Sequence, residues 1–412
     1  MSSHPYNSSR FEYDLTSYYK NYFPFKPFVK WMQYGQKPSE YFCRREFAFI
    51  LADDVHLRYK SFKNTLSFQQ ALCSTNPHKL DLGAVYNYMP SENKKHSDFS
   101  AVERELVFDI DLTDYDTVRT CCQDAKVCPK CWKFVVMAVK ILDNLLEEMF
   151  DFKARMWVFS GRRGVHCWIG DEKARKLNNS GRAAIASFLN RFKKENTFEV
   201  TDGRRKITTV PPVVKRSYKT AMKGDVFEKM LAEQEWLKTS DPLFDFPYMS
   251  DWTKSMFKEN LEQYNTPEAR WELIKKIFDP ETRAKCGENA PQPPQGRDRH
   301  FLKYFVLKRV YPRLDVNVST GTNHLLKSPF CVHPKTGNVA VPLDVDDIEN
   351  FDVENCPRID HVINEARMET NQDDNDENSE SQENRKVLAY RHGILAPYVR
   401  NFEKFVELAI VS

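Results

Sequence analysis

The chain has 412 residues, of which 41% are hydrophobic and 29% charged, a balance typical of a globular protein with one large or two ordinary domains. No stretch approaches the roughly 18 uninterrupted apolar residues of a membrane helix, and the first residues lack the basic-then-apolar order of a secretory signal. We therefore expect the protein in the cytosol or nucleus, with its 10 cysteines free, buried or metal-bound. The net charge of +3 excludes a polycation, so affinity for phosphate must come from a local patch.

The first half of the chain mixes helical and strand patterns. Aromatic residues at near-helical spacing predict two short helices within residues 11–42, and a strand pair is predicted at 45–51 and 55–62. Further along, the patterns predict a half-buried strand at 105–112, a cysteine-rich loop at 121–132 and a helix at about 132–150. Two strands at 155–159 and 165–169 and a second helix at about 180–195 follow.

The second half predicts a helical insertion at 221–290, followed by a Pro-rich connector at 290–299. Alternation predicts a strand at 313–319. Residues 368–386 are strongly acidic and predict a disordered loop. These patterns suggest an α/β core in two parts, 1–220 and 300–365, with a C-terminal segment at 387–412 whose helix, at about 395–410, packs on the core.

Two aspartates share one face of the strand in ELVFDIDLTDYD. Every second residue from Leu106 to Leu112 is apolar, which places Asp109 and Asp111 together on the opposite face, about 6.6 Å apart. Two carboxylates at this spacing can hold a pair of divalent cations, as in phosphoryl and nucleotidyl transfer, although an ordinary solvated strand face carries the same residue types. The strand predicted in RLDVNVSTG repeats the pattern and offers a third carboxylate, Asp315.

Two adjacent arginines occupy a turn between apolar strands in MWVFSGRRGVHCWIGD. The glycines of the turn permit positive φ and close backbone approach, and Arg162 and Arg163 supply planar donor forks that match phosphate oxygens. By its parity, His166 should point toward the same side as the turn. Arginines in hairpins are usually solvated, but this combination, flanked by Ser160, predicts a phosphate site.

Three further basic residues follow the predicted Asp315 strand. Lys327 is suited to act as a point charge for phosphate, and His324 or His333 to donate a hydrogen bond to it. Each of these residues, taken alone, is more often structural or exposed than catalytic.

Four cysteines lie close together in CCQDAKVCPKCW. Cys128 and Cys131 form a pair of the zinc-knuckle kind, and Cys121 and Cys122 are able to complete a tetrahedral four-sulfur site. Neighbouring side chains diverge in extended backbone, so both upstream cysteines bind only if the chain turns sharply, and His96 is an alternative ligand. A redox-active C-x-x-C pair is the competing interpretation. A closed metal site would be structural and would pin the loop that leaves the aspartate strand.

Taken in this order, the segments resemble the small catalytic subunit of the archaeal-eukaryotic primase family, most closely its eukaryotic form. The resemblance is carried by ELVFDIDLTDYD, CCQDAKVCPKCW, FSGRRGVHCWIGD and RLDVNVSTGTNHLLKSPFCVHPKTG, with YFCRREFAF and KLDLGAVY nearer the N-terminus. It covers most of the chain outside the insertion and the acidic loop. It implies an α/β (α+β) primase fold with a mixed sheet core, a zinc-binding loop and a helical insertion.

The resemblance also implies roles for individual residues. Asp109, Asp111 and Asp315 match the metal-binding carboxylates, and Glu46 matches a further catalytic acid. Nucleotide contacts are implied for Ser160, Arg162, Arg163, His166, His324, Lys327 and His333, with Arg58, beside Glu46, as a further phosphate contact. The implied zinc ligands are Cys121, Cys122, Cys128 and Cys131.

The function implied is the template-directed synthesis of short RNA primers on single-stranded DNA from ribonucleoside triphosphates, at the initiation of DNA replication. The implied cofactors are two catalytic Mg²⁺ or Mn²⁺ ions and one structural Zn²⁺ ion. The implied partners are a large, iron–sulfur-bearing primase subunit and the DNA polymerase alpha complex, and the implied location is the nucleus.

Two other classes of protein fit part of the pattern. A D-x-D pair also binds Mn²⁺ and nucleotide-sugar diphosphates in glycosyltransferases, which generally work in secretory compartments. Incubation with UDP-sugars, against ribonucleotides plus poly-pyrimidine DNA, separates the two activities. A non-catalytic zinc module that binds nucleic acid is the third possibility, but three carboxylates would repel the phosphate backbone unless metals were bound. Metal-dependent pyrophosphate release distinguishes the primer-synthesising enzyme from this non-catalytic module.

Overall fold

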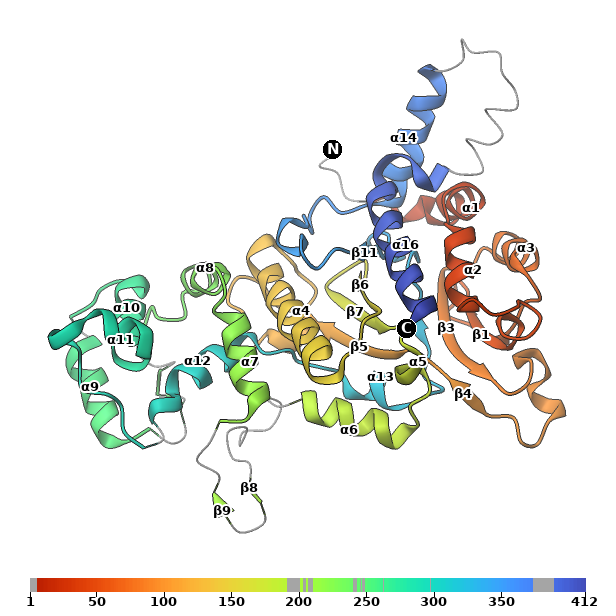
Figure 1. The fold of residues 1–412 in the computed structure, drawn as a ribbon. Coiled ribbons are helices and arrows are strands. Elements are labelled where there is room, and N and C mark those ends of the chain that lie inside the picture. Colours follow the sequence, from red (N-terminus) through yellow and green to blue (C-terminus); the bar gives the residue numbers. More distant parts are fainter. Residues whose placement is uncertain are drawn as a thin grey trace. The chain divides into compact units, whose positions relative to one another are not determined.

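The computed structural model describes residues 6–412 except 191–200, 203–204, 207–209, 240–242, 245, 247–248, 262, 297 and 373–388 (Figure 1). The chain forms two compact units: unit 1 consists of 1–110, 151–189 and 314–412, and unit 2 of 111–150 and 190–313. These units divide the chain differently from the predicted segments, because the residues of the helical insertion share unit 2 with 111–150.

Unit 1 contains two β-sheets. Sheet A has the strand order β10-β3-β1-β2, with β4 paired to β3; its strands are β1 (Arg45–Ile50), β2 (His56–Lys60), β3 (Lys79–Tyr86), β4 (Ala101–Glu103) and β10 (Leu326–Lys327). Sheet B has the order β11-β6-β7-β5, formed by β5 (Leu106–Asp111), β6 (Arg155–Phe159), β7 (Gly164–Ile169) and β11 (Pro342–Leu343). Strands β1 and β2, and strands β6 and β7, pair antiparallel, which confirms both predicted strand pairs.

Aromatic helices cover one face of sheet A. These are α1 (Phe11–Asn21), α2 (Phe25–Gln33) and α3 (Thr65–Thr75), which include the two predicted N-terminal helices. The ring of Phe68 on α3 lies 4.9 Å from that of Phe47 on β1 and 5.6 Å from that of Phe28 on α2. Phe47 therefore points into the apolar side of sheet A, and its neighbour Glu46 points to the opposite, polar side.

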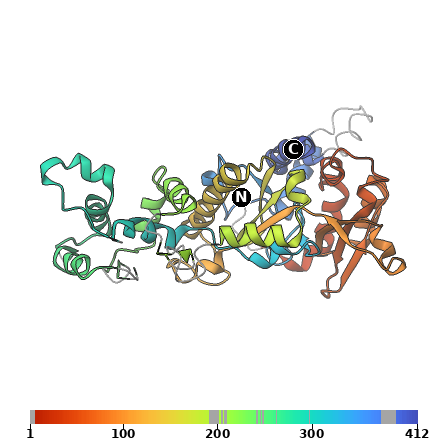
Figure 2. The ribbon, with the colours of Figure 1, turned by 60° about the horizontal axis from the view of Figure 1, so that its bottom comes forward.

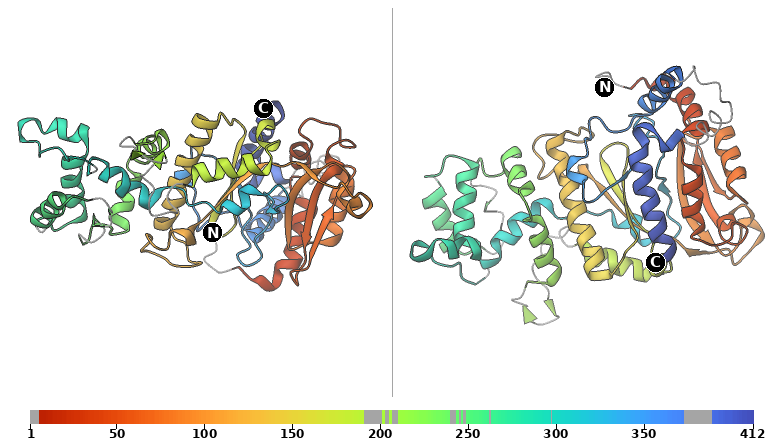
Figure 3. Two further views of the ribbon diagram at one scale, coloured as in Figure 1. Left: turned by 90° about the horizontal axis from the view of Figure 1, so that it is seen from below. Right: turned by 45° about the horizontal axis from the view of Figure 1, so that its top comes forward.

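The remaining helices of unit 1 are α5 (Glu172–Arg175), α6 (Asn179–Leu189), α13 (Val316–Thr320), α14 (Ile359–Gln372) and α16 (Ala396–Val411). Figure 2 shows α6 running beside α13, and the right panel of Figure 3 shows α16 lying along the unit near α2 and β6. On α16, Phe402 and Phe405 each place a ring 5.7 Å from that of Trp31. Residues 368–372 of the predicted acidic loop end α14, and the loop from residue 373 lies outside the described residues.

The predicted strand at 313–319 is wrong. Asp315 caps the N-terminus of the short helix α13, where its Oδ1 accepts a hydrogen bond from the backbone N–H of Asn317 (3.1 Å). Ser319, expected on a polar strand face, is fully buried. An alternating pattern of so few residues cannot separate a period of 2 from one of 3.6, and aspartate is among the preferred N-cap residues.

Unit 2 is mainly helical. Its helices are α4 (Pro129–Phe150), α7 (Pro212–Ala221), α8 (Val226–Glu233), α9 (Asp251–Leu261), α10 (Pro267–Phe278), α11 (Pro280–Lys285) and α12 (Phe301–Val310), with a two-stranded hairpin, β8 (Thr201–Asp202) and β9 (Arg205–Lys206). The ring of Phe301 lies 4.7 Å from that of Phe278 and 5.3 Å from that of Phe257. Along the described part of the chain, no helix combines the length and the apolar character needed to cross a membrane.

A buried ion pair joins the two sheets of unit 1. Arg45, the first residue of β1, donates two hydrogen bonds to Glu105, the residue before β5, at 2.8 and 2.9 Å, and both side chains are fully buried. Tyr34 donates a third hydrogen bond to this carboxylate (2.5 Å). Burial alone would raise the pKa of Glu105, but the charge and hydrogen bonds of Arg45 outweigh it and hold the pKa at about 2.

We predict that Glu105→Gln lowers the free energy of unfolding by about 3–5 kcal/mol, because Arg45 would keep a buried charge without its counterion. Urea unfolding followed by circular dichroism measures the change. As a matched control, Glu407→Gln removes the exposed partner of Lys30 and should cost at most about 1 kcal/mol. Equal, small losses for the two variants would contradict the role assigned to the buried pair.

Candidate functional site

Asp109 and Asp315 lie side by side although they are far apart in the sequence. The backbone N–H of Asp315 donates to the carbonyl oxygen of Asp109 (3.2 Å). The hydroxyl of Ser319 donates to the carbonyl oxygen of Val107 (2.7 Å), so that α13 is fastened along β5 at two points. Both aspartates are partly exposed. The structure thus brings the backbones of two of the three predicted acidic residues together, through a helix cap in place of the expected second strand.

The alternation predicted for β5 holds only at the C-terminal end of the strand. Leu106, Phe108 and Ile110 are fully buried as expected, but Val107 on the other face is fully buried as well. Asp109 and Asp111 are the partly exposed positions. Asp111 ends the strand, and its Oδ1 accepts hydrogen bonds from the backbone N–H and the hydroxyl of Thr113, at 2.9 and 2.8 Å.

Internal hydrogen bonding stabilises the arginine turn between β6 and β7. Ser160 accepts a hydrogen bond from the backbone N–H of Gly164 through its hydroxyl (3.1 Å), and Gly161 has the positive φ of +84° that the glycine predicted. Arg162 and Arg163 occupy the tip, partly exposed. On β7, His166 points toward Asp109, with its Nε2 3.7 Å from Oδ1 of the carboxylate. The prediction that His166 points to the same side as the turn stays a prediction.

The segment after α13 packs against this turn. Lys327 on β10 donates a hydrogen bond from its ammonium to the carbonyl oxygen of Ser160, and the hydroxyl of Thr336 donates to the carbonyl oxygen of Gly161 (2.7 Å). A Cβ atom on Gly161 would lie 2.9 Å from the Cβ of His333, so the glycine permits this close approach. Lys327 and His333 therefore stand at the arginine turn, and their role as phosphate contacts stays a prediction.

Burial and neighbouring cations keep the site's histidines neutral. Burial and the ammonium of Lys327 lower the pKa of His166 to about 3. Burial, Lys327 and Arg162 lower the pKa of His333 to about 3 as well. Burial also lowers the pKa of His324, with help from Arg104, although Asp315 opposes the shift. At neutral pH these rings act as neutral hydrogen-bond donors and acceptors.

Glu46 and Arg58 lie on the polar side of sheet A. Arg58 donates from Nε and Nη2 to the two carboxylate oxygens of Glu46, at 3.0 and 3.3 Å. Nη2 also reaches the carbonyl oxygen of Asn323 (3.4 Å), the residue before His324. This contact connects β2 to the segment that carries His324 and Lys327.

Sequence reasoning missed two charged residues of this site. Asp81 on β3 is the cross-strand partner of Lys327, and burial raises the pKa of its carboxyl although Lys327 opposes the rise. The alternation of Lys79, Asp81 and Gly83 in KLDLGAVY was the available signal. Arg104 is fully buried, donates to the carbonyl oxygen of Gly321 (3.2 Å) and leaves Nε and Nη2 without a partner among the described residues. No sequence pattern indicated its role.

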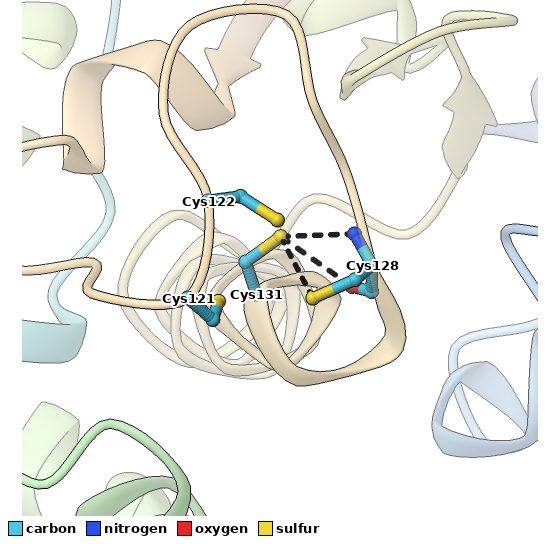
Figure 4. A group of neighbouring side chains, drawn as sticks. All are labelled: Cys121, Cys122, Cys128 and Cys131. Atoms are coloured by element: carbon cyan, nitrogen blue, oxygen red, sulfur yellow. Dashed lines mark hydrogen bonds between the residues drawn. The ribbon is translucent and has the colours of Figure 1, made fainter.

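The four predicted cysteine ligands form one cluster in unit 2 (Figure 4). The sulfurs of Cys121, Cys122, Cys128 and Cys131 all lie within 4.8 Å of one another, so the chain does turn sharply enough to present both upstream cysteines. Sγ of Cys128 and Sγ of Cys131 are 3.8 Å apart, which matches the edge of a tetrahedron with Zn–S bonds of about 2.3 Å.

The chemistry of the cluster also fits a metal ion. Burial and the three neighbouring thiols raise the pKa of Cys131, a cost that a divalent cation offsets by binding the thiolates. The gathering of four sulfurs favours a metal site over a two-cysteine redox pair. His96 is not part of this group; its ring stacks on Tyr88 at 3.7 Å, so the prediction of His96 as a substitute ligand is wrong.

Within the described residues, no second group of three or more His, Cys, Asp or Glu side chains brings its ligand atoms as close together as the cysteines do. The shared metal site at Asp109, Asp111 and Asp315 therefore stays a prediction. The donor set is nevertheless suitable, because carboxylate oxygens are the ligands that Mg²⁺ and Mn²⁺ prefer.

Unit 1 is thus an α+β structure in which acidic residues lie near cationic side chains of the kind that bind phosphate. A family model described as DNA primase small subunit matches residues 108–345. The DNA primase small subunit of Caenorhabditis elegans is 61% identical to this chain, over 98% of this chain and 99% of the relative. Those of Drosophila melanogaster and Saccharomyces cerevisiae are both 36% identical, over 88% and 87% of this chain and 83% and 86% of their own. The chain belongs to the DNA primase small subunit family, and these relatives confirm the eukaryotic form of the resemblance.

Two side chains donate hydrogen bonds to the clustered sulfurs. Gln234, fully buried at the end of α8, donates from Nε2 to Sγ of Cys121 (3.3 Å) and accepts from the backbone N–H of Thr120 (2.8 Å). Arg119 donates from Nη1 to Sγ of Cys131 (3.7 Å). Such contacts orient metal ligands and disperse the negative charge of the thiolates.

We predict that Gln234→Glu lowers zinc affinity by about 10- to 100-fold, because the carboxylate keeps the acceptor for Thr120 but loses the donor to sulfur and adds a repelling charge. Competition of the protein with a zinc-binding dye measures the affinity. Gln70→Ala, a change at an exposed glutamine on α3, is the control. An unchanged zinc affinity in Gln234→Glu would show that this contact does not support the metal.

We predict a pH effect of His333 on stability. Its pKa is about 3 in the folded chain and about 6.5 when unfolded, so the unfolded state binds more protons between these values and stability rises with pH there. Wild-type protein should therefore lose more stability than His333→Ala when the pH falls from about 7 to about 4.5. Urea midpoints at the two pH values test this, and equal losses would contradict it.

Proposed function

We propose that this chain is the catalytic subunit of a DNA primase, a polymerase-type nucleotidyltransferase that synthesises short RNA primers on single-stranded DNA at the initiation of DNA replication. Family membership supports the class. The observation that carries the proposal is the hydrogen bond from the N–H of Asp315 to the carbonyl oxygen of Asp109, which brings the backbones of these two acidic residues together, with His166 3.7 Å from the Asp109 carboxylate. The reaction needs acidic groups for metal ions next to basic groups for a triphosphate.

The carboxylates of Asp109, Asp111 and Asp315 would hold two Mg²⁺ or Mn²⁺ ions. When bound, these ions supply activation of a ribose 3′-hydroxyl and neutralisation of charge on the α-phosphate and the leaving pyrophosphate. Asp315 is well placed for this task, because the N-cap bond to Asn317 uses Oδ1 and fixes the rotamer of the side chain.

The arginine turn and β10 would hold the triphosphate. Arg162 and Arg163 offer forked, permanently charged donors. His166 and His333, with pKa values lowered to about 3, would donate as neutral rings. The remaining contacts in this proposal are the hydroxyl of Ser160, the ammonium of Lys327 and the ring of His324. These groups act by position and charge, which is the main requirement of phosphoryl-type transfer.

The proposal extends to cofactors, partners and location. The four cysteines would hold one structural Zn²⁺ ion, closed to further ligands. We expect a large, iron–sulfur-bearing primase subunit and the DNA polymerase alpha complex as partners, and the nucleus as the location. Family membership speaks against the glycosyltransferase and the non-catalytic zinc module, and no feature of the described residues favours either of them.

We predict that Asp109→Asn lowers primer synthesis by at least about 100-fold, because a neutral amide cannot compensate the cationic charge that the reaction needs. The assay is metal-dependent pyrophosphate release from ribonucleoside triphosphates on poly-pyrimidine single-stranded DNA.

The control variant is Asp251→Asn, which removes a fully exposed carboxylate at the start of α9 and should leave the rate unchanged. Zinc content and circular dichroism should match those of wild type in both variants. Synthesis by Asp109→Asn at the wild-type rate would refute the assignment.

A further inference from the structure

The carboxylate of Glu46 is closed to further ligands. The residue is fully buried, and each of its oxygens already accepts two hydrogen bonds. Oε1 accepts from Nε of Arg58 (3.0 Å) and from the backbone N–H of Tyr59 (3.2 Å). Oε2 accepts from Nη2 of Arg58 (3.3 Å) and from the hydroxyl of Tyr86 (3.0 Å). An ionised carboxylate has about four acceptor sites, so none is left for a metal ion or a substrate proton.

Sheet A is deformed on both sides of Glu46. Between β1 and β3 the register shifts, since Arg45 pairs with Val85 but Phe47 pairs with Leu82. The extra residue of β3 falls opposite Glu46, and the glycine there is required. A Cβ atom on Gly83 would lie 2.8 Å from Oε2 of Glu46, too close for any other residue.

Strand β2, which pairs with the other edge of β1, is deformed as well. Phe47 pairs with Lys60 and Phe49 pairs with Leu57, so Arg58 and Tyr59 together face Ala48 of β1, two residues after Glu46. This is a β-bulge, and Tyr59 adopts a left-handed φ of +58°, which is costly for a bulky aromatic residue. The backbone N–H of the strained residue donates to Glu46. Strain of this kind persists only where surrounding contacts hold it.

The bulge directs Arg58 toward the active site. Without it, residues 58 and 60 would share a face; with it, Lys60 pairs with Phe47 on the apolar side, and Arg58 turns to the polar side with Glu46. Nη2 of Arg58 reaches the carbonyl oxygen of Asn323, and its charge helps to lower the pKa of His324. Nη1 has no partner among the described residues, and the side chain is 35% exposed.

We propose that Glu46 is a positioning residue, which holds the bulge of β2 so that Nη1 of Arg58 binds a phosphate oxygen of the nucleotide held at the arginine turn and the Asp109–Asp315 pair. The inference rests on the proposed function and corrects the expectation that Glu46 is itself a catalytic acid. Glu46 acts through Arg58, and Arg58 touches the substrate.

The test is a double-mutant cycle on nucleotide binding. UTP with Mg²⁺, and without DNA, is titrated by calorimetry into wild type, Arg58→Ala, Glu46→Gln and the double variant. Arg58→Ala should weaken binding by about 10-fold, the effect of one charge-assisted hydrogen bond. Glu46→Gln should weaken it to a similar extent, and the double variant should bind no more weakly than Arg58→Ala, because both changes remove the same contact.

A role of Glu46 as a metal ligand gives different results. The effects of Glu46→Gln and Arg58→Ala would then multiply, and Glu46→Gln would raise the Mg²⁺ concentration that half-saturates primer synthesis. A positioning role leaves that concentration unchanged and raises KM for the nucleotide more than it lowers kcat. Multiplying effects, or a shifted Mg²⁺ dependence, would overturn the inference.

Two further variants sharpen the result. Lys60→Ala removes an exposed cation from the same strand, on the face away from the site, and should change UTP affinity by less than about twofold. Tyr86→Phe removes one hydrogen bond to Glu46 without leaving a buried charge, and should weaken binding measurably even if Glu46→Gln fails to fold. Wild-type affinity in Arg58→Ala would refute this inference while the proposed function stands, whereas a wild type that binds no UTP would refute both.

Discussion

The buried ion pair between Arg45 and Glu105 is the contact on which the geometry of unit 1 depends. Arg45 begins β1 and also donates to the carbonyl oxygen of Gly83 on β3 (3.0 Å), while Glu105 directly precedes β5. One side chain thus ties two strands of sheet A to the first residues of a strand in sheet B. Glu46 follows Arg45 in the chain and Asp109 lies on β5, so the ion pair links the positions of these two residues. Two hydrogen bonds in a water-free environment make such a link directional as well as strong.

The charged residues of the site differ in how deeply they are buried. Asp109, Asp315 and Lys327 are partly exposed, whereas Arg104 is fully buried. Burial lowers the pKa of Arg104 to about 9, which still leaves the guanidinium charged at neutral pH. An internal cation that lacks a full set of partners attracts anionic groups, and a low local dielectric strengthens that attraction.

Deformations of sheet A set the direction of side chains on its polar side. Two register shifts lie near Glu46, one opposite it at Gly83 and one opposite Ala48 at Arg58 and Tyr59, and regular strands would aim these side chains differently. Bulges are common beside active sites because they re-aim single residues without changing the rest of the sheet. Here the aromatic cluster around Phe68 fills the opposite face, so one side of the sheet is packed with rings and the other carries Glu46 and Arg58.

The amino-acid sequence alone was sufficient to predict groups of residues that lie within one segment of the chain. The C-x-x-C pair, the two aspartates of β5 and the Gly-Arg-Arg-Gly turn each owe their geometry to a few adjacent residues, so pattern and spacing predicted them. Tertiary structure decided what depends on contacts between distant segments. Asp315 reaches Asp109 from a helix cap, where a strand was expected, because the pattern at 313–319 is too short to separate the two periods. The closed carboxylate of Glu46 depends on partners from β2 and β3, and no local pattern records how many hydrogen bonds a buried side chain accepts.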